Sequence, residues 1–373
     1  MDRLEFLQTH RRALHQIPEL GLECELTATY LEKQLHAFGY ETKRYAKTAV
    51  IAFKQGQVNQ AIAFRSDTDA LPIYESTHHD YVSKHAGHMH ACGHDAHMSM
   101  LLALADELKD ETLHKSILFI FQPGEEGPGG ARVLIEEGLF KDFEVEAIFG
   151  LHVYHALEVG KIALVDGPML AMSGEVIVNV EGKSSHAAAP HDGVDAILAS
   201  THLIQAYQSI VSRTLNPLDT CVVTIGTIHG GEAQNILAGH TQMSGTIRAF
   251  SEDVFQMVEK RMDEIGKGIE TSHGVKVNTI IKRTYPPVIN PHHLYEKVKN
   301  ALDKDDYVLL KPMMFAEDFS FYQQELPGFF AMVGINGYGK GNFPLHHPEF
   351  DLDERALLSG VNYYKKIVDQ FAR

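Results

Sequence analysis

The stretch AIAFRSDTDAL, residues 61–71, combines a short apolar run with two acidic residues directly after it. The run AIAF is almost continuous in apolar side chains, which is typical of a strand buried on both faces of a parallel sheet. Similar runs recur as ILFIF at 117–121, AIFGL at 147–151 and, much later, FFAMVG at 329–334. Helical patterns lie between the first runs. This alternation predicts an α/β domain with a mostly parallel sheet that is covered by helices on both faces.

Apolar residues at helical spacing predict two helices in this part of the chain. Residues 26–38 have this spacing and are followed by Gly39, a common signal for the end of a helix. Residues 95–109 repeat it, with an apolar stripe from Met98 to Leu108.

The middle of the chain has a different pattern. Six elements are predicted there: strands at 174–182, 221–230, 241–250 and 275–283, and helices at about 192–213 and from Ser251 to about 271. Their order, β-α-β-β-α-β, is that of a ferredoxin-like unit. Because this unit lies between Gly150 and the late strand, we predict that residues 171–284 are inserted into a domain formed by residues 1–170 and 285–373.

Composition excludes several classes of partner. A chain of 373 residues is long for one core, which agrees with two domains. The formal net charge of −16 argues against nucleic acid or an anionic membrane as the main partner. The three cysteines, Cys24, Cys92 and Cys221, offer no framework of disulfides. No apolar run approaches the roughly 20 residues of a membrane span, and the N-terminus lacks the apolar core of a signal peptide. We therefore expect a soluble cytoplasmic protein.

Acidic and imidazole side chains follow the strands of the predicted sheet. They are Asp67 and Asp69 after the first run, Glu125 and Glu126 after the second, His152 after the third, and His346 and His347 well beyond the fourth. In open parallel sheets, sites form beyond the carboxyl ends of the strands. We therefore expect these side chains to lie close together.

The stretch HMHACGHDAHM, residues 88–98, is rich in histidine and contains Cys92 and His94 at the start of a predicted helix. The positive end of a helix dipole favours a thiolate there. The stretch has three interpretations: a metal site, a Cys–His nucleophile at Cys92, or a polar loop. The nucleophile leaves the carboxylates unexplained, and ligand-type residues at four strand ends favour the metal site.

The adjacent residues Glu125 and Glu126 suit amide hydrolysis. One glutamate can bind a metal ion while its neighbour, which points the other way, acts as the general base toward water.

Many stretches resemble the co-catalytic metallohydrolases of the aminoacylase and glutamate-carboxypeptidase type, in the branch with hippurate hydrolases and auxin-conjugate amidohydrolases. The similar stretches cover nearly the whole chain in order: RRALHQIPELGLE (11–23), RSDTDALPI (65–73), MHACGHDAHM (89–98), QPGEEGPGGA (122–131), GLHV (150–153), GKSSHAAAPHDGVDAI (182–197), QNILA (234–238), GTIR (245–248), AEDFSFY (316–322) and LHHPEFDLDERAL (345–357).

The resemblance implies two divalent metal ions per chain, with manganese, zinc and cobalt as candidates. The implied ligands are Cys92, His94, Glu126, His152 and His346. Many members of the wider family have His-x-Asp where this chain has Asp67-Thr68-Asp69, and an Asp in the motif where it has Cys92-Gly93-His94. A thiolate changes the metal preference, so the identity of the metal stays open. The neighbour His347 also leaves open which of the two imidazoles binds.

The resemblance also assigns roles around the substrate. Glu125 is implied as the general base, and Asp69 as the acid that orients a metal ligand. His186 in the inserted domain is implied to stabilise the oxyanion. Asn235 and Arg248 are implied to hold a carboxylate of the substrate, a role for which the guanidinium fork is well suited.

The activity implied by the resemblance is the removal of an acyl group, most often acetyl, from a small N-acyl amino acid. The stretches 222–238, 316–336 and 344–350 are most similar to family members that deacetylate N-acetyl-L,L-diaminopimelate in lysine biosynthesis. Two alternatives stay open: a general N-acyl-amino-acid or hippurate amidohydrolase, and a non-enzymatic protein that binds a metal or ligand. The resemblance further implies a homodimer in which the inserted domain is the lid and dimerisation domain, and in which His186 serves the partner's site.

Overall fold

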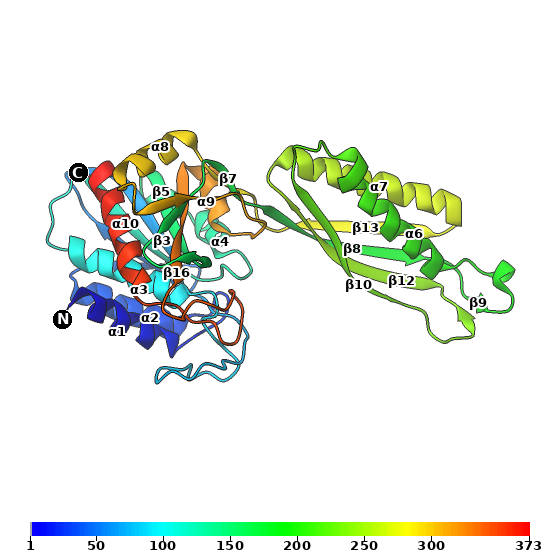
Figure 1. Cartoon of the computed structure of the whole chain (residues 1–373), viewed down its shortest axis with the longest axis horizontal. Coiled ribbons are helices and arrows are strands. Elements are labelled where there is room, and N and C mark those ends of the chain that lie inside the picture. Colours follow the sequence, from blue (N-terminus) through cyan, green and yellow to red (C-terminus); the bar gives the residue numbers. More distant parts are fainter. Residues whose placement is uncertain (1) are drawn as a thin grey trace. The chain divides into compact units, whose positions relative to one another are not determined.

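The protein consists of two compact units, and the computed structural model describes residues 2–373 (Figure 1). The first unit contains the residues up to Met169 together with Val288–Pro312 and Asp318–Arg373, and the second contains Leu170–Pro287 and Met313–Glu317.

The short segment Met313–Glu317 groups with the second unit although the sequence gives no signal for it. The backbone N–H of Ala171 donates to the carbonyl of Phe315 at 2.9 Å, and Leu170 forms a bridge with Met313. These contacts attach the segment to the start of the inserted unit.

An eight-stranded sheet in the order β1-β2-β4-β3-β5-β16-β6-β15 forms the centre of the first unit. The strands are β1 (Thr42–Tyr45), β2 (Ala49–Lys54), β3 (Val58–Asp67), β4 (Lys115–Gln122), β5 (Val145–Glu158), β6 (Ile162–Leu164), β15 (Tyr307–Leu309) and β16 (Gly328–Asn336). β3 is parallel to β4 and β5, and β16 is parallel to β5. These four are the strands predicted from apolar runs, and the mostly parallel sheet is confirmed. The antiparallel pairs β1–β2, β2–β4 and β6–β16 were not predicted.

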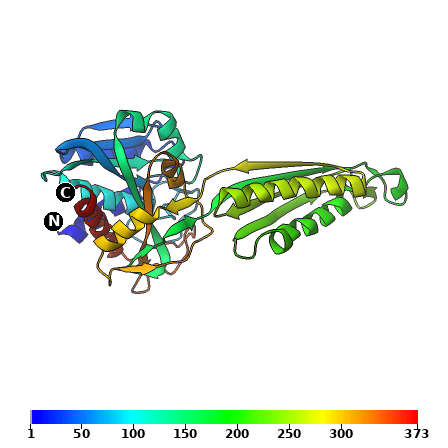
Figure 2. The ribbon, with the colours of Figure 1, turned by 90° about the horizontal axis from the view of Figure 1, so that it is seen from above.

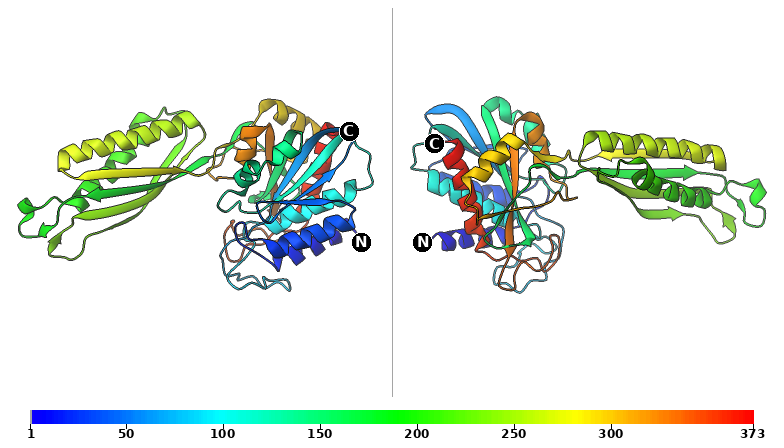
Figure 3. Two further views of the ribbon diagram at one scale, coloured as in Figure 1. Left: turned by 180° about the vertical axis from the view of Figure 1, so that it is seen from behind. Right: turned by 45° about the horizontal axis from the view of Figure 1, so that its top comes forward.

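Helices cover both faces of this sheet (Figure 3). They are α1 (Arg3–His15), α2 (Glu25–Ala37), α3 (His94–Leu108), α4 (Gly130–Glu136), α5 (Leu139–Asp142), α8 (His292–Ala301), α9 (Phe319–Glu325) and α10 (Ala356–Phe371). Adjacent residues of β5 show the two faces: the ring of Phe149 packs on Phe371 of α10, with centroids 4.9 Å apart, whereas Gly150 lies against Phe319 of α9. The predicted helices at 26–38 and 95–109 correspond to α2 and α3. A further two-stranded sheet joins β7 (Gly167–Leu170) and β14 (Val288–Asn290).

The second unit is a four-stranded antiparallel sheet with two helices on one face (Figure 2). Its elements are β8 (Met172–Glu181), α6 (Ala196–Ser209), a π-helical turn (Ile210–Thr214), β10 (Cys221–Gly230), β12 (His240–Ala249), α7 (Glu252–His273) and β13 (Lys276–Arg283). The order β10-β12-β8-β13 is that of a ferredoxin-like unit, as predicted. Side chains cap both helices, because Asp195 accepts from the N–H of Leu198 and Ser251 from that of Val254. The cap at Asp195 explains why α6 begins later than the predicted start at 192.

A short ribbon extends from this sheet. β9 (Ser185–His186) follows β8, passes into a 3-10 turn (Pro190–Asp192), and pairs with β11 (Ile236–Leu237), which precedes β12. Each unit has its own cluster of buried apolar side chains. Within residues 2–373, no helix has the length and apolar character needed to cross a membrane.

Candidate metal centre

The turn Cys92-Gly93-His94 starts α3 and requires glycine at its centre. Gly93 has a φ of +83°, in the left-handed region that other residues rarely adopt. A Cβ atom built at this position would lie 2.4 Å from the Val153 side chain. The glycine therefore lets the chain turn tightly against β5 and brings the flanking Cys92 and His94 to one place.

His94 presents one ring nitrogen to the interior. Its Nδ1 donates to the carbonyl of Asp69 at 2.7 Å, so Nε2 is the nitrogen left to bind a metal ion. This Nε2 is buried and has no hydrogen-bond partner within the described chain; the Asp67 carboxylate is 3.6 Å away. Burial lowers the pKa of His94, but the carboxylates of Asp67 and Asp69 outweigh it and raise the pKa to about 10. The surroundings thus favour a positive charge at Nε2, which a metal cation would supply.

His152 is held in a similar way. Its Nδ1 donates to the carbonyl of Val153 at 2.7 Å, and its Nε2 lies 3.3 Å from the Sγ of Cys92. Burial is the main reason why the pKa of His152 is well below its usual value, so the imidazole is neutral, as a metal ligand must be. His152 lies inside β5 and not after its end, because β5 continues along β16 beyond Gly150, where its pairing with β3 stops.

Asp69 fixes both adjacent glutamates. Its Oδ1 accepts the backbone N–H of Glu125 and its Oδ2 that of Glu126, each at 3.0 Å. Together with its carbonyl bond to His94, this makes Asp69 the common support of three candidate site residues. The sequence predicts an orienting role for this acid, and the structure supplies contacts through which it would act.

His346, and not His347, joins the cluster. The Nε2 of His346 lies 3.1 Å from the Oε1 of Glu126, and its backbone N–H donates to the carbonyl of Ala91 at 2.9 Å. Its φ is +66°, a conformation that non-glycine residues adopt mostly where neighbouring structure enforces it. His347 turns away, with its ring stacked on Phe343 at 4.5 Å.

The five predicted ligands therefore gather in one region, which is buried at Cys92, His94 and His152 and open to solvent at His346. Cys92, Glu126 and His346 form one group, and His94, Glu125 and Glu126 form another, and in each group the possible ligand atoms lie within 4.8 Å of one another. Burial and the carboxylates of Glu126 and Glu125 raise the pKa of the Cys92 thiol well above its usual value, so a nearby cation is needed to make it a thiolate. One thiol, three imidazoles and one carboxylate suit zinc, cobalt or manganese. The residues present fit a pair of divalent ions.

Two buried residues of this region were not assigned a role from sequence. Asp67 and His97 belong with His94 and His152 to a further group whose possible ligand atoms lie within 4.8 Å. The sequence holds a partial signal, because His97 follows His94 by three residues and helical residues at this spacing share one face.

The predicted substrate residues all lie in the second unit, in two separate places. His186 is on the β9–β11 ribbon, where it pairs with Ile236, and the carbonyl of Asn235 accepts the N–H of Ala187 at 2.9 Å. The ribbon therefore brings His186 and Asn235 together.

Arg248 is at the opposite end of this unit. It lies eight residues along β12 from His240, where the ribbon begins, which is roughly 26 Å at the rise of a strand. Its guanidinium donates to the hydroxyl of Thr246 and to the carbonyl of Ile247. Asn235 and Arg248 of one chain therefore do not converge on one carboxylate.

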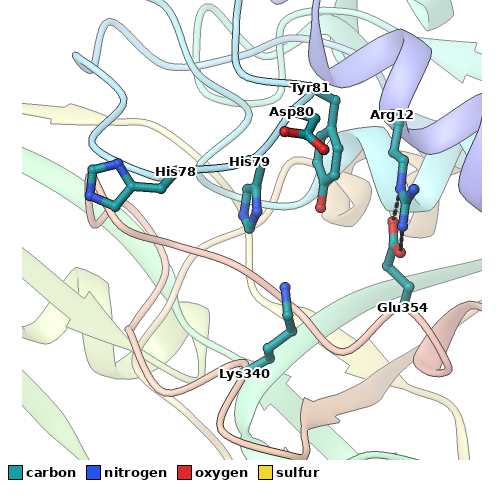
Figure 4. A pocket seen from close by; sticks show the side chains of 7 residues that line it. All are labelled: Arg12, His78, His79, Asp80, Tyr81, Lys340 and Glu354. Carbon is teal, nitrogen blue, oxygen red and sulfur yellow. Dashed lines mark hydrogen bonds and ion pairs between the residues drawn. The ribbon is translucent and has the colours of Figure 1, made fainter.

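A separate cavity of about 350 Å³ opens in the first unit (Figure 4). It is lined by Arg12, His78, His79, Asp80, Tyr81, Lys340 and Glu354. Arg12 and Glu354 form a two-bond ion pair, and Lys340 pairs with Asp351. Because these charges already neutralise one another, the cavity offers no strong site for an anion, and none of the predicted site residues lines it.

Comparisons with known proteins agree with this geometry. Residues 63–370 match the model of the peptidase family M20/M25/M40. N-acetyldiaminopimelate deacetylase of Bacillus pumilus (strain SAFR-032) is 36% identical over 372 residues, which cover 97% of this chain and 98% of that protein. IAA-amino acid hydrolase ILR1-like 4 of Arabidopsis thaliana is also 36% identical, with 99% of this chain and 86% of that protein covered.

A solved structure is similar over the whole length. The YXEP protein of Bacillus subtilis, described as a dinuclear metal binding peptidase from the M20 family, has a TM-score of 0.87 and 31% identity, and 99% of each chain is covered. Since the family match runs through both units and the relatives span nearly the whole chain, the protein belongs to the peptidase family M20/M25/M40 and is a metallohydrolase.

Proposed function

We propose that the protein hydrolyses N-acetyl-L,L-diaminopimelate to acetate and L,L-diaminopimelate, a step of lysine biosynthesis. One observation carries the amide hydrolysis: Asp69 fixes two adjacent glutamates, of which Glu126 lies with Cys92 and His346 while Glu125 lies beside it with its own carboxylate. A protein that only binds metal would have no need of the second glutamate.

The metal ions would be held by the thiol, imidazole and carboxylate ligands of the first unit. They are Cys92, His94, Glu126, His152 and His346. Two divalent ions supply Lewis acidity, which lowers the pKa of water and polarises the amide carbonyl. Manganese, zinc and cobalt all suit this mixed ligand set.

Glu125 moves the proton in this scheme. Its carboxylate takes a proton from the water that attacks the acetyl carbon, and returns it to the nitrogen when the C–N bond breaks. Its backbone is fixed by Asp69, so the carboxylate needs little reorganisation. His186 would stabilise the negative charge that develops on the carbonyl oxygen, and Asn235 and Arg248 would hold the carboxylate of the amino acid.

The choice of substrate rests on the relatives. N-acetyldiaminopimelate deacetylases from several Bacillus species are 36% to 37% identical to this chain. The Arabidopsis thaliana IAA-amino acid hydrolase reaches 36%, and this equal identity keeps a general N-acyl-amino-acid amidohydrolase as the second candidate.

A homodimer would complete the site. Asn235 lies on the ribbon that precedes β12, and Arg248 lies near the far end of that strand, so they can hold one substrate only if they come from different chains. The edge strand β10 favours pairing with a second copy, because its sequence CVVTIGTIHG has no proline, lysine, arginine or acid over its ten residues. We propose an isologous homodimer in which His186 serves the partner's metal centre. The cytoplasmic location expected from sequence stays a prediction.

A panel of substrates tests the proposal. N-acetyl-L,L-diaminopimelate, N-acetyl-L-leucine and an IAA-amino acid are compared by kcat/KM with the metal-loaded protein. Because a site built for a distal ammonium and carboxylate leaves polar groups unpaired with other substrates, we expect N-acetyl-L,L-diaminopimelate to have a kcat/KM at least about tenfold above the others. Equal rates for all three would favour the general amidohydrolase, and no acetate release from any of them would refute an amide hydrolase.

A further inference from the structure

His97 lies among ligand-type residues but has not been given a role. It is fully buried on the first turn of α3, and its ring centroid is 4.6 Å from that of His152 and 5.5 Å from that of His94. By type and position it is a candidate for a sixth metal ligand.

The hydrogen bonds of His97 contradict that role. The backbone N–H of Val153 donates to its Nε2 at 2.9 Å, and because an N–H can only donate, this nitrogen is unprotonated and already occupied. The other nitrogen, Nδ1, then carries the proton and donates to the Oδ1 of Asp67 at 2.6 Å. Both ring nitrogens of His97 are thus used by protein groups.

The same contacts connect His97 to a candidate ligand. Val153 donates its N–H to His97 and accepts the Nδ1–H of His152 at its own carbonyl, at 2.7 Å. The backbone of Val153 therefore transmits the position of His97 to the imidazole of His152. The two rings also meet edge to face, at an interplanar angle of 67°.

Asp67 is fixed from behind by further buried charges. Arg65 donates to the Oδ2 of Asp67 at 3.0 Å and to Asp318 at 2.7 Å. All three side chains are fully buried, so the carboxylate that receives the His97 proton has little freedom to move. A rigid support of this kind is what an orienting contact requires.

We propose that Asp67 and His97 form a positioning pair that aims the Nε2 of His152 at its metal ion, and that His97 itself binds no metal. The proposal rests on the metal centre proposed above. It predicts that loss of His97 lowers the affinity for the ion held by His152 more than the affinity for the other ion.

Matched variants separate positioning from general destabilisation. His97→Leu removes both hydrogen bonds, whereas His97→Gln keeps one donor and one acceptor. His10→Leu is the control, because His10 is also buried and loses one hydrogen bond, to Tyr30 at 2.7 Å. His10 interacts with Asp106 in the last turn of α3, whereas His94 and His97 are in its first turn. Stoichiometry and affinity are measured with Mn²⁺ and Co²⁺, and the visible spectrum of the Co²⁺ form reports the ligand geometry.

The expected pattern is specific. His97→Leu lowers the affinity for one of the two ions by roughly ten- to a hundredfold, as the loss of other orienting contacts does. It also changes the Co²⁺ spectrum. His97→Gln restores most of the affinity, and His10→Leu keeps wild-type affinity even if its melting temperature falls. A folded His97→Leu protein with wild-type affinity for both ions would overturn the pair, whereas a wild-type protein that binds no metal would overturn the metal centre itself.

A measurement on the unmodified side chains covers the case in which His97→Leu does not fold. Wild-type protein with ¹⁵N-labelled histidine is loaded with ¹¹³Cd²⁺ and studied by NMR. We expect a ¹¹³Cd–¹⁵N coupling at the Nε2 of His152 and none at His97. A coupling at His97 would show that it is a ligand and would refute the proposal.

Discussion

The carboxylate of Asp69 accepts the backbone N–H of Glu125 at 3.0 Å, and its second oxygen accepts that of Glu126 at the same distance. One side chain thus fixes the backbone positions of both glutamates. With both backbones held by Asp69, a substitution of either glutamate side chain should leave the position of the other unchanged, so their roles can be tested one at a time.

Asp69→Asn should impair catalysis although it changes only one atom of the side chain. The new NH₂ group would face a backbone N–H, so one of the two bonds is lost and a glutamate shifts. A misplacement on the order of 1 Å can cost about a hundredfold in rate, and we expect a loss of kcat of that order. Asp106→Asn, which breaks only a surface pair with Lys109, is the control. Wild-type kcat in Asp69→Asn would contradict the supporting role.

Glu125→Gln and Glu126→Gln should differ in kind. Glu125→Gln keeps the shape but removes the base, so kcat should fall by roughly a hundredfold or more while both ions stay bound. Glu126→Gln should lose metal, because its carboxylate lies with Cys92 and His346. Metal content and kcat are measured on the same samples. If the reverse pattern appears, the two roles are exchanged.

Removal of metal should abolish hydrolysis, and Mn²⁺, Co²⁺ or Zn²⁺ should restore it. Cys92→Ser should weaken metal affinity, because a hydroxyl is a poorer ligand than a thiolate for these ions. Elemental analysis before and after chelation gives the stoichiometry, for which we expect up to two ions per chain. Unchanged metal content in Cys92→Ser would remove this residue from the ligand set.

Mixed dimers test whether His186 acts in the partner's site. Glu125→Gln and His186→Ala should each lose nearly all activity, and their subunits are allowed to exchange. If His186 acts across the dimer, each mixed dimer has one intact site. Random mixing makes about half of the dimers mixed, so about a quarter of all sites should recover. Activity that stays at the mutant level after verified exchange would place His186 in its own chain's site.

The buried ion pairs of His15 should make the stability of the first unit depend on pH. Burial lowers the pKa of His15, but hydrogen bonds to Asp95 at 2.8 Å and to Glu75 at 3.2 Å raise it to about 9. Since the folded pKa is above the unfolded value of about 6.5, this stabilisation is complete below pH 6.5 and is lost as the pH rises through 9. The free-energy difference between wild type and His15→Gln should therefore shrink by about 3 kcal/mol between pH 6 and 10. A constant difference across urea titrations at these pH values would contradict this.

The central strands were predictable because burial on both faces leaves an unbroken apolar run, as in ILFIF at 117–121. The short strand β6, which is antiparallel to β16, could not be predicted, because Ile162–Leu164 is too short to show a period. At the site, residue types at the strand ends indicated a metal. The choice between His346 and His347 depended on a positive φ at one and a stack on Phe343 at the other, and neither is visible in a linear sequence.

The separation of Asn235, on the ribbon before β12, from Arg248, near the far end of that strand, also bears on how the enzyme behaves on dilution. If one chain alone cannot bind a substrate through both residues, a monomer is inactive even when it is fully folded and loaded with metal. Specific activity would then follow the fraction of chains in dimers, and would fall as the enzyme concentration drops below the dissociation constant of the pair. Assays at nanomolar enzyme would underestimate the activity of a sound preparation, and a plot of rate against enzyme concentration would curve upward.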